Sequence, residues 1–258
     1  MGFFRKKKDK TEESKPASKK EAVDRAVRSL DPTPVKADQE SGDVPRVRRR
    51  RRSATSRSAR EGATAKRVDF FMKLVLCGDG AVGKTALRER FLGKGFSSSY
   101  LQTIGADFAS IDKEINVPET GSKTVKYQIW DLAGQLQFQA VRSSYYEGCF
   151  GALMVFDLTR PDSFANIPNW IEELWKNSQR GKVPVVLLGN KADLIGQFPE
   201  HVTQEAIDSY IEKLNAEVAQ YKFTVPYLTT SALTGQNVEE AFKKMGESVL
   251  SWIEHRDK

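Results

Sequence analysis

Four residues with the chemistry to hold a polyphosphate lie close together near residue 80. Gly78, Gly83, Lys84 and Thr85 fit the spacing G-x-x-x-x-G-K-[ST]. Glycines let backbone N–H groups turn toward phosphate oxygens, a lysine can reach the terminal phosphates, and a threonine hydroxyl can bind Mg²⁺. A nucleotide is therefore predicted to bind the loop formed by Gly78, Asp79, Gly80, Ala81, Val82, Gly83, Lys84, Thr85 and Ala86.

The elements on both sides of this loop must position it. The apolar run at residues 70–77 predicts a strand, and residues 84–93 predict a helix. The phosphates would then lie at a helix N-terminus, where the partial positive charge favours anions. The alternative is a plain glycine turn between strand and helix, which Lys84 and Thr85 directly after Gly83 disfavour.

A second segment with chemical potential is residues 130–135 (WDLAGQ), which closes another predicted strand. Asp131 is expected at a carboxyl end of the sheet, where ligands of open α/β folds bind. Its carboxylate could hold Mg²⁺ through a water molecule. Gly134 could turn its N–H toward a γ-phosphate, and Gln135 is placed to orient an attacking water.

A third segment, residues 188–193 (LGNKAD), predicts which base is bound. A carboxylate accepts hydrogen bonds from N1–H and the amino group of guanine, whereas adenine offers an acceptor at N1. Asp193 therefore selects guanine, because an unpaired carboxylate in a closed pocket is costly. The stem of Lys191 could cover the ring, and backbone groups after the last strand could donate to the guanine O6. The predicted base site consists of Asn190, Lys191, Asp193, Ser231, Ala232 and Leu233.

Charge is distributed unevenly along the 258 residues. Residues 1–68 contain 21 Lys and Arg against 10 Asp and Glu, whereas the remainder contains 20 against 24. The first segment has no aromatic residue after Phe4, so it cannot bury enough apolar surface to fold and is predicted to be a disordered basic arm. Its basic runs at residues 5–8 and 46–52 could hold the protein at an anionic membrane surface. The run at 46–52 could instead bind an import receptor, or nucleic acid, which we do not expect. A solvated arm without a partner is the alternative.

The cysteines and apolar runs indicate the compartment. Cys77 and Cys149 both lie in apolar runs, so we expect buried thiols in a reducing environment. No apolar run reaches the ~18–20 residues that span a bilayer, and no secretory signal is evident. We expect a soluble cytoplasmic protein that is peripheral on a membrane if the arm binds lipid.

From residue 69 onward, strand-like and helical patterns alternate, which predicts an α/β fold. The second and third strands have no helix between them, so they should pair antiparallel, and the others should be parallel. Strands are predicted at 70–77, 106–115, 124–131, 151–157, 184–189 and 225–230, and helices at 84–93, 136–145, 163–178, 203–220 and 236–254.

Together these segments resemble a small GTPase of the Ras superfamily, which are P-loop NTPases. The Rab branch is most similar, because residues 96–108 (FSSSYLQTIGADF), 143–148 (SSYYEG) and 156–159 (FDLT) resemble its switch and strand motifs. The resemblance covers residues 69–258 and none of the arm. It implies a small G domain with a six-stranded, mostly parallel sheet, one antiparallel strand and five flanking helices.

The resemblance also implies residue roles. Thr85 and Thr103 would bind Mg²⁺ directly, and Asp131 through water. Phe96 would stack on guanine, and Tyr100 would close over the phosphates. The catalytic residues would be Gln135, Lys84 and Thr103.

The implied activity is slow hydrolysis of GTP to GDP and phosphate by a monomeric molecular switch. Gly80 leaves room beside the γ-phosphate, and we expect an activating protein to raise the rate ~10³–10⁵-fold. That protein, an exchange factor and effectors would bind near residues 100–108 and 130–147. The alternative function is a GTP-binding module with little hydrolysis, whose arm binds membrane or nucleic acid; intact Thr103 and Gln135 favour the switch.

Two departures from the Rab pattern change expectations. No cysteine follows Cys149, so we expect no prenyl anchor and propose that the basic arm replaces it electrostatically. Leu136 occupies a position that is usually acidic and helps hold the phosphate-loop lysine during nucleotide exchange, so the usual exchange mechanism is not expected to transfer unchanged.

Overall fold

The computed structural model describes residues 67–96, 102–117, 121–135 and 139–256. The predicted disorder of the arm, apart from Arg67 and Val68, lies outside the described residues. So do the predictions for Tyr100 and Leu136.

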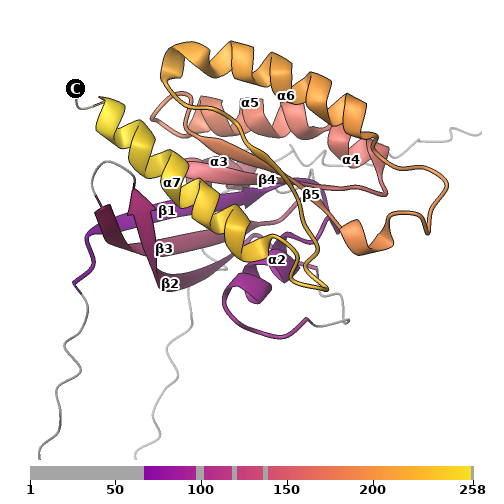
Figure 1. The fold of residues 1–258 in the computed structure, drawn as a ribbon, viewed down its shortest axis with the longest axis horizontal. Coiled ribbons are helices and arrows are strands. Elements are labelled where there is room, and N and C mark those ends of the chain that lie inside the picture. The colour runs from indigo at the N-terminus through magenta and orange to yellow at the C-terminus, as the bar shows by residue number, and fades with distance from the viewer. Residues whose placement is uncertain (1–66, 97–101, 118–120, 136–138, 257–258) are drawn as a thin grey trace, which may run out of the picture. The chain divides into compact units, whose positions relative to one another are not determined.

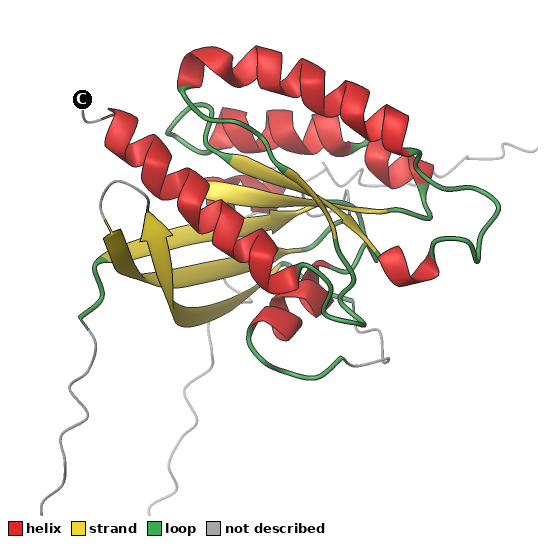
Figure 2. Ribbon diagram, in the orientation of Figure 1, coloured by secondary structure: helices red, strands yellow, loops and turns green. Residues whose placement is uncertain are grey.

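A six-stranded sheet forms the centre of the fold in the order β2-β3-β1-β4-β5-β6 (Figures 1 and 2). Among the described strands only β2 and β3 pair antiparallel, as predicted from the missing helix between them. β4 and β5 are buried at every residue, which suits parallel strands covered on both faces. The strands are β1 (Phe70–Cys77), β2 (Ala106–Val117), β3 (Gly121–Leu132), β4 (Gly151–Asp157), β5 (Val185–Asn190) and β6 (Tyr227–Thr229).

The helices agree with the predicted pattern except at one break. The single helix expected at 163–178 is divided at Asn166, because Pro168 lacks an N–H and its ring would clash with the carbonyl of Phe164 in a continuous helix. The helices are α2 (Lys84–Phe91), α3 (Gln139–Tyr146), α4 (Pro161–Ala165), α5 (Ile167–Asn177), α6 (Gln204–Val218) and α7 (Val238–Arg256), with 3₁₀ turns η2 (Ala192–Leu194) and η3 (Ala219–Tyr221).

Helices cover both faces of the sheet, and each face has its own apolar core. α3, α5 and α6 pack on one face, and α2 and α7 pack on the other (Figure 1). Phe91 and Phe242 stack between α2 and α7 with ring centroids 3.8 Å apart. The two cores fix the strand ends, so the loops at the carboxyl edge of the sheet have a rigid base.

Two expectations about cysteines and membranes can be compared with this fold. Cys77 and Cys149 are free thiols and both are buried, as predicted. Across the described residues, no helix combines the length and apolar character needed to cross a bilayer.

Candidate nucleotide-binding site

The loop after β1 has a backbone that only glycine tolerates at its two ends. Gly78 has φ 137° and Gly83 has φ 101°, both in the region that side chains rarely adopt. A Cβ on Gly78 would also collide with the carbonyl oxygen of Val155 in β4. The loop therefore turns tightly off the sheet and delivers Lys84 as the first residue of α2.

Lys84 is held inside this loop. Its ammonium donates to the carbonyl oxygens of Gly78 and Asp79 at 2.7 and 2.8 Å, and the residue is 6% exposed. Burial lowers the pKa of Lys84 to about 8, against the raising effect of the nearby Asp131 carboxylate. The cation is thus positioned at the concave side of the loop, where it could exchange a carbonyl for a phosphate oxygen.

The three residues predicted to bind Mg²⁺ converge. Thr85 Oγ1 donates to Asp131 Oδ2 at 2.5 Å and lies 3.1 Å from Thr103 Oγ1. Asp131 is fully buried, yet its other oxygen, Oδ1, has no hydrogen-bond partner among the described residues. Burial raises the pKa of Asp131, opposed by the Thr85 hydrogen bond and the Lys84 charge. Two hydroxyls and a carboxylate with a spare oxygen fit a hard, water-retaining cation such as Mg²⁺.

Gln135 lies beside the phosphate loop, as its predicted role requires. Its Nε2 is 3.6 Å from where a Cβ on Gly80 would lie, and its Oε1 is buried without a partner among the described residues. Gly134 packs directly on the backbone of Asp79 and Gly80, so closely that a Cβ there has no room. The small size of Gly80 and Gly134 is what lets the Gln135 amide approach the loop.

At the other end of the predicted site, Asn190 joins three segments. Its Nδ2 donates to the Val82 carbonyl at 2.8 Å, and its Oδ1 accepts from Thr230 Oγ1 and Ala232 N, both at 3.2 Å. Asn190 is 1% exposed. It therefore fixes the phosphate loop and the loop after β6 at a set separation.

Lys191 and Asp193 are held by partners within the chain. Lys191 has φ 66°, and its Nζ lies 2.7 Å from Asp157 Oδ2. The Asp193 carboxylate accepts a hydrogen bond from Ser231 Oγ. The Ser231 N–H is used by Gln236 O, and the Ala232 N–H by Asn190. Leu233 is exposed at this edge, and Phe96 is exposed after α2.

Comparison with known proteins agrees with this geometry. The sequence model of the Ras family matches residues 73–251. GTP-binding protein ypt1 of Schizosaccharomyces pombe is 38% identical over 181 residues, which are 70% of this chain and 81% of that protein. Ras-related protein RABD2c of Arabidopsis thaliana is also 38% identical over 181 residues, with the same coverage of both chains.

The chain belongs to the Ras family. Within it the chain is a Rab-like small GTPase, and members of this class hydrolyse GTP. The resemblance read from the sequence motifs is therefore confirmed.

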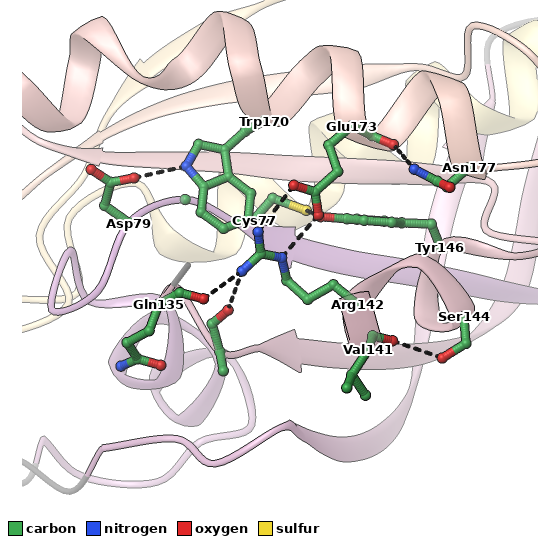
Figure 3. A network of polar contacts seen from close by, with 12 residues as sticks. Cys77, Asp79, Gln135, Val141, Arg142, Ser144, Tyr146, Trp170, Glu173 and Asn177 are labelled. Atoms are coloured by element: carbon green, nitrogen blue, oxygen red, sulfur yellow. Dashed lines mark hydrogen bonds and ion pairs between the residues drawn. The ribbon is translucent and has the colours of Figure 1, made fainter. Parts of the chain in front are cut away.

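Residues that the sequence motifs did not identify hold the loops of this Rab-like GTPase from behind. The Asp79 carboxylate accepts from Trp170 Nε1 and Asn166 Nδ2, both at 2.8 Å, and Arg160 Nη1 donates to the Gly80 carbonyl at 3.0 Å (Figure 3 shows the Trp170 contact). Nothing in the spacing of these residues indicates that they meet the phosphate loop.

The predicted partner-binding segments of the Rab-like GTPase present an aromatic surface. Trp130 lies between Phe108 and Tyr145, with ring centroids 5.1 and 5.5 Å away. Ile104, four residues before Phe108, is 81% exposed. These residues fall inside the predicted segments 100–108 and 130–147.

Proposed function

We propose that residues 69–258 bind GTP and GDP with Mg²⁺ and hydrolyse GTP slowly, so that the chain acts as a Rab-like switch in membrane trafficking. The observation that carries the proposal is the convergence of Thr85, Thr103 and Asp131 next to Gln135, with two buried acceptor oxygens left without described partners. Buried polar atoms are normally paired, so these two oxygens are suited to contact a bound ligand.

Each residue of the phosphate end has a definite task in this proposal. Lys84 binds the β- and γ-phosphates, and Thr85, Thr103 and Asp131 hold Mg²⁺, the last through water. When bound, the metal ion neutralises charge on the phosphates. Gln135 orients the attacking water, and Gly80 leaves space for it.

At the base end, Asp193 accepts the two guanine donors, and Lys191 and Phe96 cover the faces of the ring. The loop of Ser231, Ala232 and Leu233 borders the base, with Asn190 as its brace. Tyr100 closes over the phosphates. This assignment makes guanine recognition independent of the γ-phosphate.

The conformational change between the GTP and GDP states follows from the two groups that contact the γ-phosphate. Thr103 and Gly134 are tethered to it in the GTP state and are released by hydrolysis. Their release changes the surface that contains Phe108, Trp130 and Tyr145. We propose that effectors, an activating protein and an exchange factor bind there.

Single-turnover hydrolysis tests the catalytic assignment. Gln135→Leu should slow hydrolysis by about a hundredfold, the range for loss of one positioned hydrogen-bonding group, while GTP affinity is retained. Gln128→Leu, at a half-buried position of β3 that is not among the site residues, is the matched control and should hydrolyse at the parent rate. An unchanged rate in Gln135→Leu would sink the assignment.

For the arm, we propose binding to an anionic membrane surface. Residues 1–68 carry a net charge of +11 against −4 for the rest, and each basic residue near an acidic bilayer contributes about 1 kcal/mol. Vesicles containing phosphatidylserine should retain the full chain at low salt and less of it at physiological salt. Equal retention of a chain that lacks residues 1–68 would end this proposal.

A further inference from the structure

An ion pair between a buried arginine and a partly buried glutamate lies directly behind the loop that carries Gln135. Arg142 of α3 and Glu173 of α5 form a two-pronged contact, Nε to Oε1 at 2.9 Å and Nη2 to Oε2 at 3.0 Å (Figure 3). Arg142 is 2% exposed. Burial lowers the pKa of Arg142, but the Glu173 hydrogen bonds and charge outweigh this and raise it, so the guanidinium stays charged.

The third nitrogen of Arg142 is used on the catalytic loop. Nη1 donates to the Ala133 carbonyl at 3.2 Å and to the Gln135 carbonyl at 2.8 Å. A planar guanidinium fixes all of its donors in one fork, so orienting it on Glu173 also orients the donor that holds Gln135. The backbone of Gln135 is thereby attached to α5 through a single side chain.

The same ion pair is linked to the phosphate loop through Trp170. The Arg142 guanidinium lies 4.2 Å from the ring centroid of Trp170, and Trp170 Nε1 donates to Asp79 Oδ1. On the far side, Tyr146 OH donates to Glu173 Oε1 at 3.1 Å (Figure 3). Catalytic loop and phosphate loop are therefore both positioned against α5.

Stability alone does not require charges here. A buried ion pair can often be replaced by apolar residues of similar volume without loss of stability. Apolar residues, however, would leave the carbonyls of Ala133 and Gln135 without this donor. The charged pair thus has a task that packing cannot perform.

We propose that Arg142 and Glu173 are positioning residues for GTP hydrolysis, which hold the Gln135 backbone so that its side chain meets the attacking water beside Gly80. The inference rests on the proposed function of Gln135. We expect GDP affinity to be retained without the pair, because the contacts described for Arg142 and Glu173 include none with Lys84, Thr85 or Asp193.

The full-length chain with Arg142→Met and Glu173→Leu combined tests the proposal. Single-turnover hydrolysis should fall at least about tenfold, while the GDP affinity stays near the parent value. The unfolding temperature should also fall, because the carbonyls of Ala133 and Gln135 and the hydroxyl of Tyr146 lose their partners. The double change Lys182→Met with Glu217→Leu removes an ion pair that touches neither loop, and it should leave hydrolysis unchanged. A parent-like rate in the Arg142 and Glu173 variant would overturn the proposal.

Two further variants keep the test decisive if the apolar pair does not fold. Arg142→Lys keeps the charge but has one compact head that cannot serve Glu173 and both carbonyls, so it should also slow hydrolysis. Adding Arg142→Lys to Gln135→Leu should cause no further loss, since the arginine acts through Gln135. Additive losses would mean a general structural role and would refute positioning.

The outcome also separates this inference from the one on which it rests. If Gln135→Leu itself leaves the rate unchanged, the proposed role of Gln135 fails. If Gln135→Leu slows hydrolysis but Arg142→Lys does not, only the positioning role fails.

Discussion

The two ends of the nucleotide site differ in how completely they are paired within the chain. At the base end, Asn190, Lys191 and Asp193 each have a partner, namely the Val82 carbonyl, Asp157 and Ser231. At the phosphate end, one oxygen of Asp131 and one of Gln135 are buried without a partner among the described residues.

If the site binds nucleotide as proposed, this difference explains how it could hold both GTP and GDP and still distinguish them. A pre-paired base end has a fixed geometry, which suits a guanine common to GTP and GDP. An end with open acceptors is completed only by its ligand, so its conformation depends on which ligand is present. Specificity and switching are therefore assigned to different sets of residues.

Asp193→Asn should break the base end most strongly. An amide cannot accept both guanine donors, and hydrogen-bonding sites reject mismatched partners by about 10⁴-fold. GTP and GDP affinity should fall by that order in competition with a fluorescent GDP analogue. Asp208→Asn on the surface of α6 is the control and should bind like the parent; similar affinity in both variants would contradict the role of Asp193.

Removing the divalent ion should loosen the phosphate end alone. Two opposite unit charges about 4 Å apart attract by about 4 kcal/mol at an effective dielectric constant near 20. When EDTA removes Mg²⁺, the phosphates lose an attraction of this order, part of which water replaces. We expect GDP release to accelerate about a hundredfold, measured by stopped-flow fluorescence. Thr85→Ala should show a smaller acceleration, because one metal ligand is already missing; full sensitivity in that variant would argue against Thr85 as a ligand.

Asn190→Ala should uncouple the two ends. It leaves the Val82 carbonyl and the Ala232 N–H without their partner, and buried groups of this kind cost about 1–3 kcal/mol each. The unfolding free energy should fall by about 3 kcal/mol, and GDP affinity should fall with it. Asn215→Ala is the control, because Asn215 makes a similar pair of hydrogen bonds to the backbone of Val225 and neither residue belongs to the predicted site. This variant should lose stability but keep the parent GDP affinity. Equal affinity losses would rule out a specific role for Asn190.

The smallest effect is expected from thiol reagents. Burial raises the pKa of Cys149 to about 12 and raises the pKa of Cys77 as well. Few thiolates then exist at pH 8, so iodoacetamide should modify neither cysteine in the folded chain and both after denaturation. Between pH 9 and 12 the unfolded chain releases thiol protons that the folded chain keeps, so the unfolding free energy should decrease as pH rises.

Sequence patterns predicted the strands and helices well where periodicity decides them. They ended the second strand at 115 and began the third at 124, but the antiparallel ladder continues through Asn116↔Ser122 and Val117↔Gly121. Asn116, Ser122 and Gly121 are polar or small, so an apolar pattern does not detect this part of the ladder even though Val117 is buried. The break at Asn166 required weighing Pro168 against an otherwise helical pattern.

For the site, the sequence identified residues whose chemistry acts on a ligand, and the structure brings Thr85, Thr103 and Asp131 together. The sequence did not identify Arg142, because a charged residue in a predicted helix normally faces solvent. Arg142 is buried because Glu173 lies opposite it, 31 residues later in the chain. A pairing made by tertiary packing leaves no trace in local spacing.

In the proposed site, the single amide of Asn190 would make the protein a chelator of its nucleotide. Because Asn190 joins Val82 to Ala232, the phosphate loop and the loop after β6 are held at one separation. A ligand bound to the phosphate loop therefore meets the base-binding loop at high effective concentration. A fragment that engages only one loop, such as guanosine or pyrophosphate, should therefore bind weakly. The binding free energies of the two fragments should sum to far less than that of the whole nucleotide. Affinity in this fold is a property of the distance between two loops as much as of either loop.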